Sequence, residues 1–230
     1  MYAIDCSVWS DFEVVKQEMV GADLVIVGLH HGITPNHYAQ QQLAYAVSQG
    51  KRIAAYITIS PSTNELDVVN QARDLAAEFW PQLSFVSIDV EIEGVGVLQI
   101  INACKAVEAM GKRVCIYTNQ GFWQEHMDDT QMLSNYPLWD ANWNDHQWIE
   151  PVGYGGWDWP IGHQYQELTA VDWSVFNDTY VDESSNQSEL LQLMDILWGW
   201  TTFKKNKKVT RALEKECHQA IIRIKEILEI

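Results

Sequence analysis

Two acidic side chains stand two residues apart at the end of an apolar run, Ser87-Ile88-Asp89-Val90-Glu91. Because side chains alternate between the faces of a strand, Asp89 and Glu91 are expected to share one face. Two carboxylates on one buried face repel each other, which raises the pKa of one of them, and a carboxyl group that keeps its proton can act as a general acid. The alternative is that Glu91 and Glu93 only mark the exit of the strand into solvent.

Two further acids follow β-rich runs elsewhere in the chain. Asp5 follows Tyr2-Ala3-Ile4, and Asp172 follows Thr169-Ala170-Val171. If the sheet closes into a barrel, the carboxyl ends of its first, fourth and last strands meet at one mouth. The sequence therefore predicts one catalytic group of four acids, Asp5, Asp89, Glu91 and Asp172, which favours the functional interpretation over the solvent exit.

Aromatic and amide side chains are expected near the same mouth, because they also lie at or just after the ends of predicted strands. Sugar rings present apolar C–H faces and hydroxyl edges, which aromatic platforms and amides can bind. The pattern therefore predicts a carbohydrate groove. The candidate substrate-binding residues are Tyr56, Tyr117, Asn119, Trp139, Asn142, Gln164 and Tyr165.

Neither a metal nor an organic cofactor is indicated. Cys6, Cys104, Cys115 and Cys217 lie far apart without a Cys-x-x-Cys pair, so we interpret them as reduced core residues. His30, His31 and His37 lie close together but lack a pattern of partner carboxylates, and we interpret them as polar loop residues. No glycine-rich phosphate-binding motif follows a predicted strand.

Eight short β-rich runs alternate with helical patterns, which is typical of a parallel sheet. One helix pattern begins near Ser62 and Glu65, which could form a capping box. The connections between residues 138 and 172 lack a helical period, so we predict an irregular eight-stranded β/α barrel. The predicted strands are 2–5, 24–28, 53–57, 83–91, 114–118, 138–142, 163–165 and 170–172.

Charge divides the chain into two parts. The formal net charge is −16, yet residues 184–230 hold eight basic and six acidic residues, and residues 1–183 hold seven and 25. Such an acidic main part argues against a nucleic-acid surface. No apolar run is long enough for membrane insertion. We therefore predict a catalytic barrel over residues 1–183 and a separate module over residues 184–230.

The C-terminal module has two apolar stripes at helical spacing, which predict a pair of amphipathic helices in residues 189–230. A lone helix pair must hide its stripes against each other, against the barrel or against another subunit. A hairpin docked on the barrel, a wall-targeting module and self-association into a homo-oligomer all remain open. The stripes are Leu190, Leu193, Met194 and Leu197, then Val209, Leu213, Cys217, Ala220, Ile221, Ile224 and Leu228.

The order of segments resembles glycoside hydrolase family 25, the Chalaropsis-type muramidases, through residues 1 to about 180. The resemblance rests on Ala3-Ile4-Asp5, Ile88-Asp89-Val90-Glu91, Val114–Thr118, His163-Gln164-Tyr165 and Val171-Asp172. It implies that Glu91 is the general acid, that Asp89 stabilises charge or orients the 2-acetamido group of the substrate, and that Asp5 and Asp172 support them. The chain departs from the family after its second strand, at Gly28-Leu29-His30-His31-Gly32.

The implied activity is cleavage of the β-1,4 bond between N-acetylmuramic acid and N-acetylglucosamine in bacterial peptidoglycan, without a cofactor or metal. The N-terminus lacks the basic and apolar regions of a signal peptide. We therefore expect a phage endolysin that accumulates in the host cytoplasm and reaches the wall after membrane permeabilisation. The alternative is a non-catalytic glycan-binding or virion structural domain on the same barrel.

Overall fold

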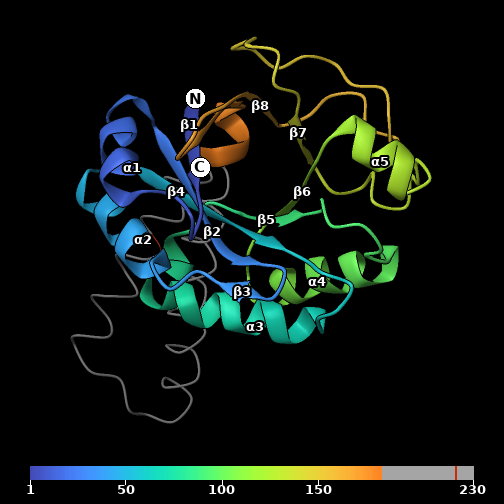
Figure 1. Ribbon diagram of the computed structural model, residues 1–230, viewed down its shortest axis with the longest axis horizontal. Coiled ribbons are helices and arrows are strands. Elements are labelled where there is room, and N and C mark those ends of the chain that lie inside the picture. The colour runs from blue at the N-terminus through green and yellow to red at the C-terminus, as the bar shows by residue number, and fades with distance from the viewer. Residues whose placement is uncertain (183–220, 222–230) are drawn as a thin grey trace. The chain divides into compact units, whose positions relative to one another are not determined.

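Eight strands close into a barrel in the computed structural model, which describes residues 1–182 and residue 221. The strands follow one another around the barrel in the order β1, β2, β4, β5, β6, β7, β8 and β9, and β9 pairs with β1 to close it (Figure 1). The predicted eight-stranded β/α barrel is therefore confirmed. Their bounds are β1 Tyr2–Cys6, β2 Leu24–His31, β4 Arg52–Thr58, β5 Val86–Asp89, β6 Val114–Thr118, β7 Leu138–Ala141, β8 Gly162–Glu167 and β9 Asp172–Phe176, with β3 (Thr34–Pro35) as a short hairpin partner of β2.

Helices lie around the outside of the strands (Figure 1). The side chains of Asp11, Asn64 and Asn119 accept backbone N–H groups and so begin three of these helices. Asn64 therefore takes the capping role that we predicted for Ser62. Between β7 and β8 the chain forms no helix, as predicted. The helices are α1 Phe12–Glu18, η1 Met19–Gly21, α2 Ala39–Ser48, α3 Glu65–Ala76, η2 Ala77–Gln82, α4 Val97–Ala109 and α5 Gln120–His126.

Alternation along the strands builds two buried layers. Ile4, Val25 and Ile88 point outward and join the core between the strands and the helices. Side chains on the opposite face fill the barrel interior with a second apolar cluster. This second cluster contains Ala3, Leu24, Ile26, Ala54, Phe85, Cys115, Tyr117, Trp139, Ala141, Phe176, Tyr180 and Val181.

The last strand differs from the prediction. Residues 170–172 were expected to form a strand that ends at Asp172, but β9 begins there and runs antiparallel to both β8 and β1. The chain reverses direction after β8, so that β9 runs back along the barrel wall between β8 and β1. Because an antiparallel strand starts where its parallel neighbours end, Asp172 still reaches the predicted mouth.

The fourth barrel strand is also shorter than predicted. β5 ends at Asp89, so Glu91 lies two residues beyond the strand. Val90 between them is fully buried in the outer core. The alternation of the strand thus continues into the turn and keeps both carboxyl groups on the same side.

The predicted tail helices in residues 189–230 lie outside the described residues, apart from Ile221, and they stay a prediction. Where the structure describes the chain, no helix is long and apolar enough to cross a membrane.

Candidate active site

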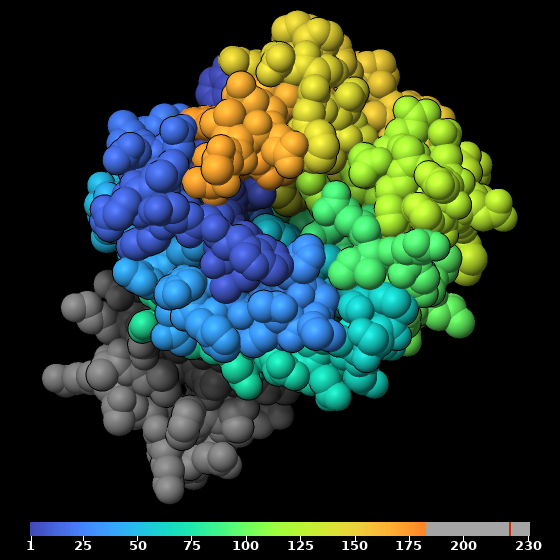
Figure 2. All heavy atoms as spheres, viewed as in Figure 1, coloured from blue at the N-terminus to red at the C-terminus, as the bar shows by residue number. Residues whose placement is uncertain are grey.

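A cavity of about 340 Å³ opens at the end of the barrel where the parallel strands finish. Figure 2 shows this face hollowed near its centre, between blue, orange and green segments. All four predicted acids line the cavity. Its lining comprises Asp5, Ser7, Trp9, His31, Tyr56, Asp89, Glu91, Tyr117, Trp139, Glu167 and Asp172.

Asp5 lines this cavity and lies directly opposite Asp172 in the register of β1 and β9. Gln164 Nε2 donates a 2.8 Å hydrogen bond to Asp5 Oδ2. Burial is the main cause that raises the pKa of Asp5, and the charge of Asp172 adds to it, whereas the hydrogen bond from Gln164 opposes them. Asp5 therefore resists ionisation more than an exposed aspartate does.

Asp172 is less deeply placed and accepts a 3.0 Å hydrogen bond from the backbone N–H of Leu168. Burial raises the pKa of Asp172 to about 6, although this hydrogen bond lowers it in part, and the charge of Glu167 raises it further. Glu167 ends β8 and was not identified from the sequence. Its contribution shows that five carboxyl groups, rather than four, surround the cavity.

Asp89 and Glu91 behave as a pair. Burial and the neighbouring Glu91 raise the pKa of Asp89, and a 2.5 Å hydrogen bond from Thr58 Oγ1 lowers it. Burial also raises the pKa of Glu91, while its hydrogen bond with Asp89 lowers it and the charge of Asp172 raises it again. Two carboxyl groups in such contact share one proton over a wide pH range.

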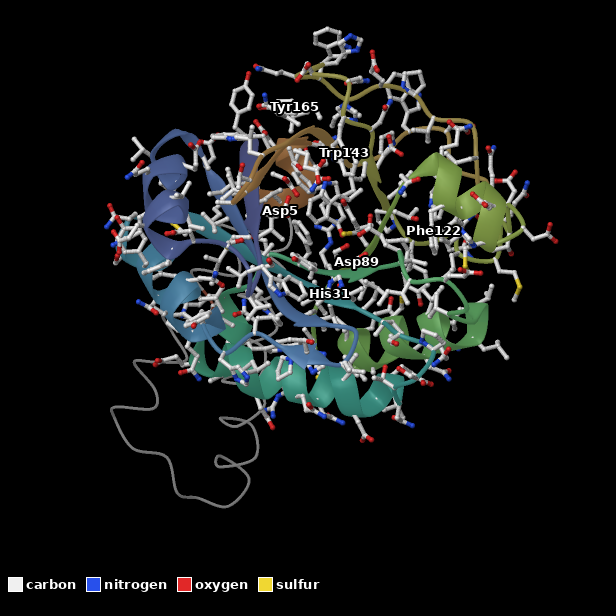
Figure 3. The ribbon with its side chains drawn as sticks, in the orientation of Figure 1. Asp5, His31, Asp89, Phe122, Trp143 and Tyr165 are labelled. Atoms are coloured by element: carbon white, nitrogen blue, oxygen red, sulfur yellow. The ribbon has the colours of Figure 1, made fainter. Side chains whose placement is uncertain are left out.

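Gln164 connects the acids to the aromatic walls. Its Oε1 accepts hydrogen bonds of 2.8 Å from Tyr117 Oη and from Trp143 Nε1, while its Nε2 donates to Asp5. Trp139 packs edge-on against Tyr117, with 4.5 Å between ring centroids. Figure 3 shows the side chains of Asp5, Asp89 and Trp143 around the centre of the barrel.

The ring of Tyr56 packs closely against the backbone of Gly28. A Cβ atom built on Gly28 would lie 2.4 Å from the Tyr56 ring, so only glycine leaves room for the phenol there. Burial raises the pKa of Tyr56 well above its ordinary value, and the charge of Asp5 adds to this. Tyr56 therefore remains a neutral hydroxyl group.

Three predicted substrate-binding residues lie away from the acids. Asn119 and Asn142 line a separate cavity of about 460 Å³ beside α5, where Asn119 also caps that helix through Phe122 N. Tyr165 follows the inward-facing Gln164 on β8 and is not among the residues lining either cavity. In Figure 3, Tyr165 lies apart from Asp5 and Asp89.

Four residues that line the cavity were not predicted from the sequence, namely Ser7, Trp9, His31 and Glu167. Trp9 meets the His31 ring edge-on, with 4.8 Å between ring centroids. The prediction that no metal binds rested on the spacing of the cysteines and histidines and on the resemblance to glycoside hydrolase family 25. Within the described residues, no group of three or more His, Cys, Asp or Glu side chains is arranged so that it could hold a metal ion, and the cysteines at 6, 104 and 115 are free and buried.

The sequence of this chain is similar to that of known proteins. The profile described as "Glycosyl hydrolases family 25" matches residues 4–173. Probable GH family 25 lysozyme 3 of Dictyostelium discoideum is 30% identical over 69 residues, which cover 29% of this chain but only 14% of that protein.

Solved structures share the fold. A muramidase from Acremonium alcalophilum matches with a TM-score of 0.65 at 16% identity, covering 82% of this chain and 98% of that one. The catalytic domain of endolysin ply40, from bacteriophage P40 of Listeria monocytogenes, matches with a TM-score of 0.59 at 14% identity, covering 80% and 98%. At these identities the likeness establishes the fold alone.

Proposed function

The chain belongs to glycosyl hydrolase family 25 and is a glycoside hydrolase, and we propose that it is an N-acetylmuramidase that acts on bacterial peptidoglycan. The bond cleaved is the β-1,4 linkage from N-acetylmuramic acid to N-acetylglucosamine. The observation that carries the proposal is the convergence of Asp5, Asp89, Glu91 and Asp172 on one cavity walled by Tyr56, Tyr117 and Trp139.

In this mechanism the proton shared by Asp89 and Glu91 is the one that is transferred to the substrate. Glu91, the more exposed of the two, donates it to the glycosidic oxygen as the bond from that oxygen to the anomeric carbon breaks. The sugar left behind develops positive charge. The Asp89 carboxylate stabilises this charge or orients the 2-acetamido group of the substrate, and water finally supplies the hydroxyl group of the new reducing end.

Asp5 and Asp172 support the pair from the opposite side of the cavity. Asp5 raises the pKa of Asp89 and Asp172 raises that of Glu91, because a carboxylate disfavours ionisation of its neighbours. The same two side chains can accept hydrogen bonds from sugar hydroxyl groups. They therefore keep a proton available at the site and also contribute to substrate binding.

The first prediction concerns Glu91→Gln, which is nearly isosteric but cannot donate a proton comparably. We expect turnover of purified cell walls to fall by about 10² to 10⁴-fold, the usual contribution of a general acid. The assay counts new reducing ends and identifies the sugar that carries them. The matched control is Glu93→Gln, because Glu93 is exposed two residues further along and does not line the cavity.

Equal losses in both variants, or full activity in Glu91→Gln, would contradict the role of Glu91. Release of free amino groups without new reducing sugar would indicate an amidase or peptidase instead. Wall binding without any cleavage by the unmodified protein would favour the alternative, a non-catalytic glycan-binding or virion structural domain.

We also propose that the enzyme serves phage-mediated lysis, acting on the wall from a host cytoplasm once the membrane has been permeabilised. The support is fold likeness to the catalytic domain of a phage endolysin. Expression in a bacterial host should leave cells intact until a membrane pore is supplied, and lysis should then follow. Lysis without a pore, or no lysis with one, would argue for a different biological setting.

A further inference from the structure

Three adjacent strands end in polar residues that touch one another. His31 is the last residue of β2, Thr58 of β4 and Asp89 of β5. The sheet register pairs His31 with Thr58 and Thr58 with Asp89. These three side chains therefore form a row across the carboxyl ends of three adjacent strands, and Figure 3 labels its two ends, His31 and Asp89, next to each other.

A bulge in β2 directs His31 into this row. The register between β2 and β4 shifts between Gly28 and His30, so Leu29 is an extra residue. Without the shift, strict alternation would turn His30 inward and His31 outward. Instead, His30 is buried with its Nδ1 near the carbonyl oxygen of Gly32, and His31 lines the cavity.

The hydrogen bonds of Thr58 determine which groups donate and which accept along this row. Thr58 Oγ1 lies 2.5 Å from Asp89 Oδ2 and 3.2 Å from His31 Nδ1. A hydroxyl group has a single hydrogen to donate. When Asp89 is ionised that hydrogen goes to the carboxylate, so the hydroxyl oxygen accepts from a protonated Nδ1 of His31.

We propose that His31, acting through the Thr58 hydroxyl group, is a positioning residue that keeps the proton shared by Asp89 and Glu91 on Glu91. Its Nδ1–H fixes the Thr58 hydroxyl group as a donor toward Asp89. That donor stabilises the ionised form of Asp89 and leaves the proton on the group that must deliver it. The inference rests on the proposed function, which gives Glu91 the role of acid.

Asp89 needs this donor because its other surroundings favour protonation. Its Oδ1 is buried without a hydrogen-bond partner among the described residues, and its side chain is only 3% exposed. Burial raises the pKa of Asp89, and the charge of Glu91, the hydrogen bond with Glu91 and the charge of Asp5 raise it further, so the Thr58 hydrogen bond is the contact that opposes them. The titratable side chains around the pair are Asp5, Glu167, Asp172, Tyr56, Tyr117, His30 and His31.

His31 acts as a neutral donor rather than as a cation. Burial lowers the pKa of His31, and the neighbouring His30 lowers it further. The edge-on contact with Trp9 holds the ring in place. A neutral, fixed imidazole can direct the Thr58 hydroxyl group without placing a full positive charge beside the reacting sugar.

The kinetic test compares matched pairs of variants in the full chain. Thr58→Val keeps the shape of the side chain but removes the hydroxyl group, and we expect kcat to fall about tenfold. KM should stay unchanged, because Thr58 is fully buried and does not contact the substrate. The acidic limb of the pH profile should move about one unit to higher pH, because Asp89 then protonates more readily. Thr58→Ser should restore both.

His31 is tested in the same way. His31→Leu should behave like Thr58→Val, whereas His31→Asn, whose amide N–H can replace Nδ1–H, should retain most activity. His37→Leu is the control, because His37 is exposed in the same segment and does not line the cavity. Unchanged kcat and pH profiles in Thr58→Val and His31→Leu, with Glu91→Gln inactive, would overturn the inference and leave the proposed function standing.

A spectroscopic readout does not depend on turnover. Nitrogen-15 NMR of the full chain should show His31 in the neutral form protonated at Nδ1, and Thr58→Val should weaken that preference. A His31 ring protonated at Nε2 alone would overturn the inference, because Thr58 would then donate to His31 instead of to Asp89. This result can be read even if the unmodified protein releases no reducing ends, which is the outcome that defeats the proposed function.

Discussion

Asp172 illustrates how a single buried carboxyl group in the candidate active site costs stability. Its pKa rises from the ordinary value of 3.8 to about 6 in the folded chain, chiefly because burial disfavours the charge. The folded state therefore holds this proton more tightly than the unfolded chain does. By linkage, the contribution of Asp172 to the free energy of unfolding falls as pH rises through this window.

The second prediction follows from this loss of stability with rising pH. Asp172→Asn should raise the melting temperature at pH 7 but change it much less at pH 4, where the folded aspartate is protonated and the unfolded aspartate, with its ordinary pKa of 3.8, is only partly ionised. It also removes a charge that raises the pKa of Asp5. Thermal melts between pH 4 and 7.5 measure the effect, with Glu78→Gln, an exposed acid away from the cavity, as the control.

A melting temperature for Asp172→Asn that drops equally at every pH would contradict this account and indicate a purely structural aspartate. The expected combination is greater stability near neutral pH with impaired turnover. Such a trade-off is common where a site gathers like charges for chemistry.

Strand registers decide which of these residues meet, and sequence patterns predict registers only in part. Regular alternation along β5 correctly places Asp89 and Glu91 on one side of the chain. Asp172 reaches the mouth although its strand runs in the opposite direction from the one predicted, because either end of a strand can be positioned there. A pattern of apolar residues identifies a strand but carries no information on its direction.

His31 could not be predicted in the same way. The alternation of β2 points His30 inward until the extra residue Leu29 breaks it, and no local sequence signal announces that bulge. Likewise, Tyr165 and Gln164 are equally plausible sugar contacts in the sequence, and only the register of β8 turns Gln164 toward Asp5. Long-range pairing, rather than local propensity, determines these placements.

The third prediction concerns the element that supports Tyr56. Gly28→Ala in β2 places a methyl group against the rigid Tyr56 ring, at a distance of 2.4 Å before any adjustment. We expect a loss of about 1 to 3 kcal/mol in the free energy of unfolding, together with a marked fall in activity as the ring leaves the cavity. Chemical denaturation and wall digestion measure the two effects.

Gly153→Ala is the matched control for that substitution. A Cβ on Gly153 meets nothing within 4 Å, and its backbone lies outside the left-handed region that favours glycine, so stability should stay the same or rise slightly. If Gly28→Ala behaved like Gly153→Ala, the close approach between β2 and Tyr56 would not matter for the site.

At the scale of the whole molecule, charge opposes the proposed encounter with the wall. The chain has a formal net charge of −16, and bacterial walls are themselves anionic. The fourth prediction is that digestion of intact walls accelerates as ionic strength rises from about 0.01 M to 0.15 M, because the Debye length shrinks from about 30 Å to about 8 Å. Initial rates on walls measure this, with short soluble glycan fragments as the less charged comparison. A rate on walls that falls over the same range would mean that attraction, not repulsion, governs the encounter.

The basic residues of the C-terminal segment provide the remaining whole-molecule prediction. Residues 184–230 hold eight of the 15 lysines and arginines. A chain ending at Asp182 keeps the buried Tyr180 and Val181, and it keeps the 2.7 Å hydrogen bond from Arg113 Nη1 to the Tyr180 carbonyl. We therefore expect it to fold and to cleave soluble fragments at the rate of the full chain, but to bind and digest intact walls more weakly. Light scattering and wall pull-down of both forms test this. Identical mass and wall binding would eliminate self-association and wall targeting as roles of the segment, and an insoluble truncated chain would indicate that the segment covers apolar surface of the barrel.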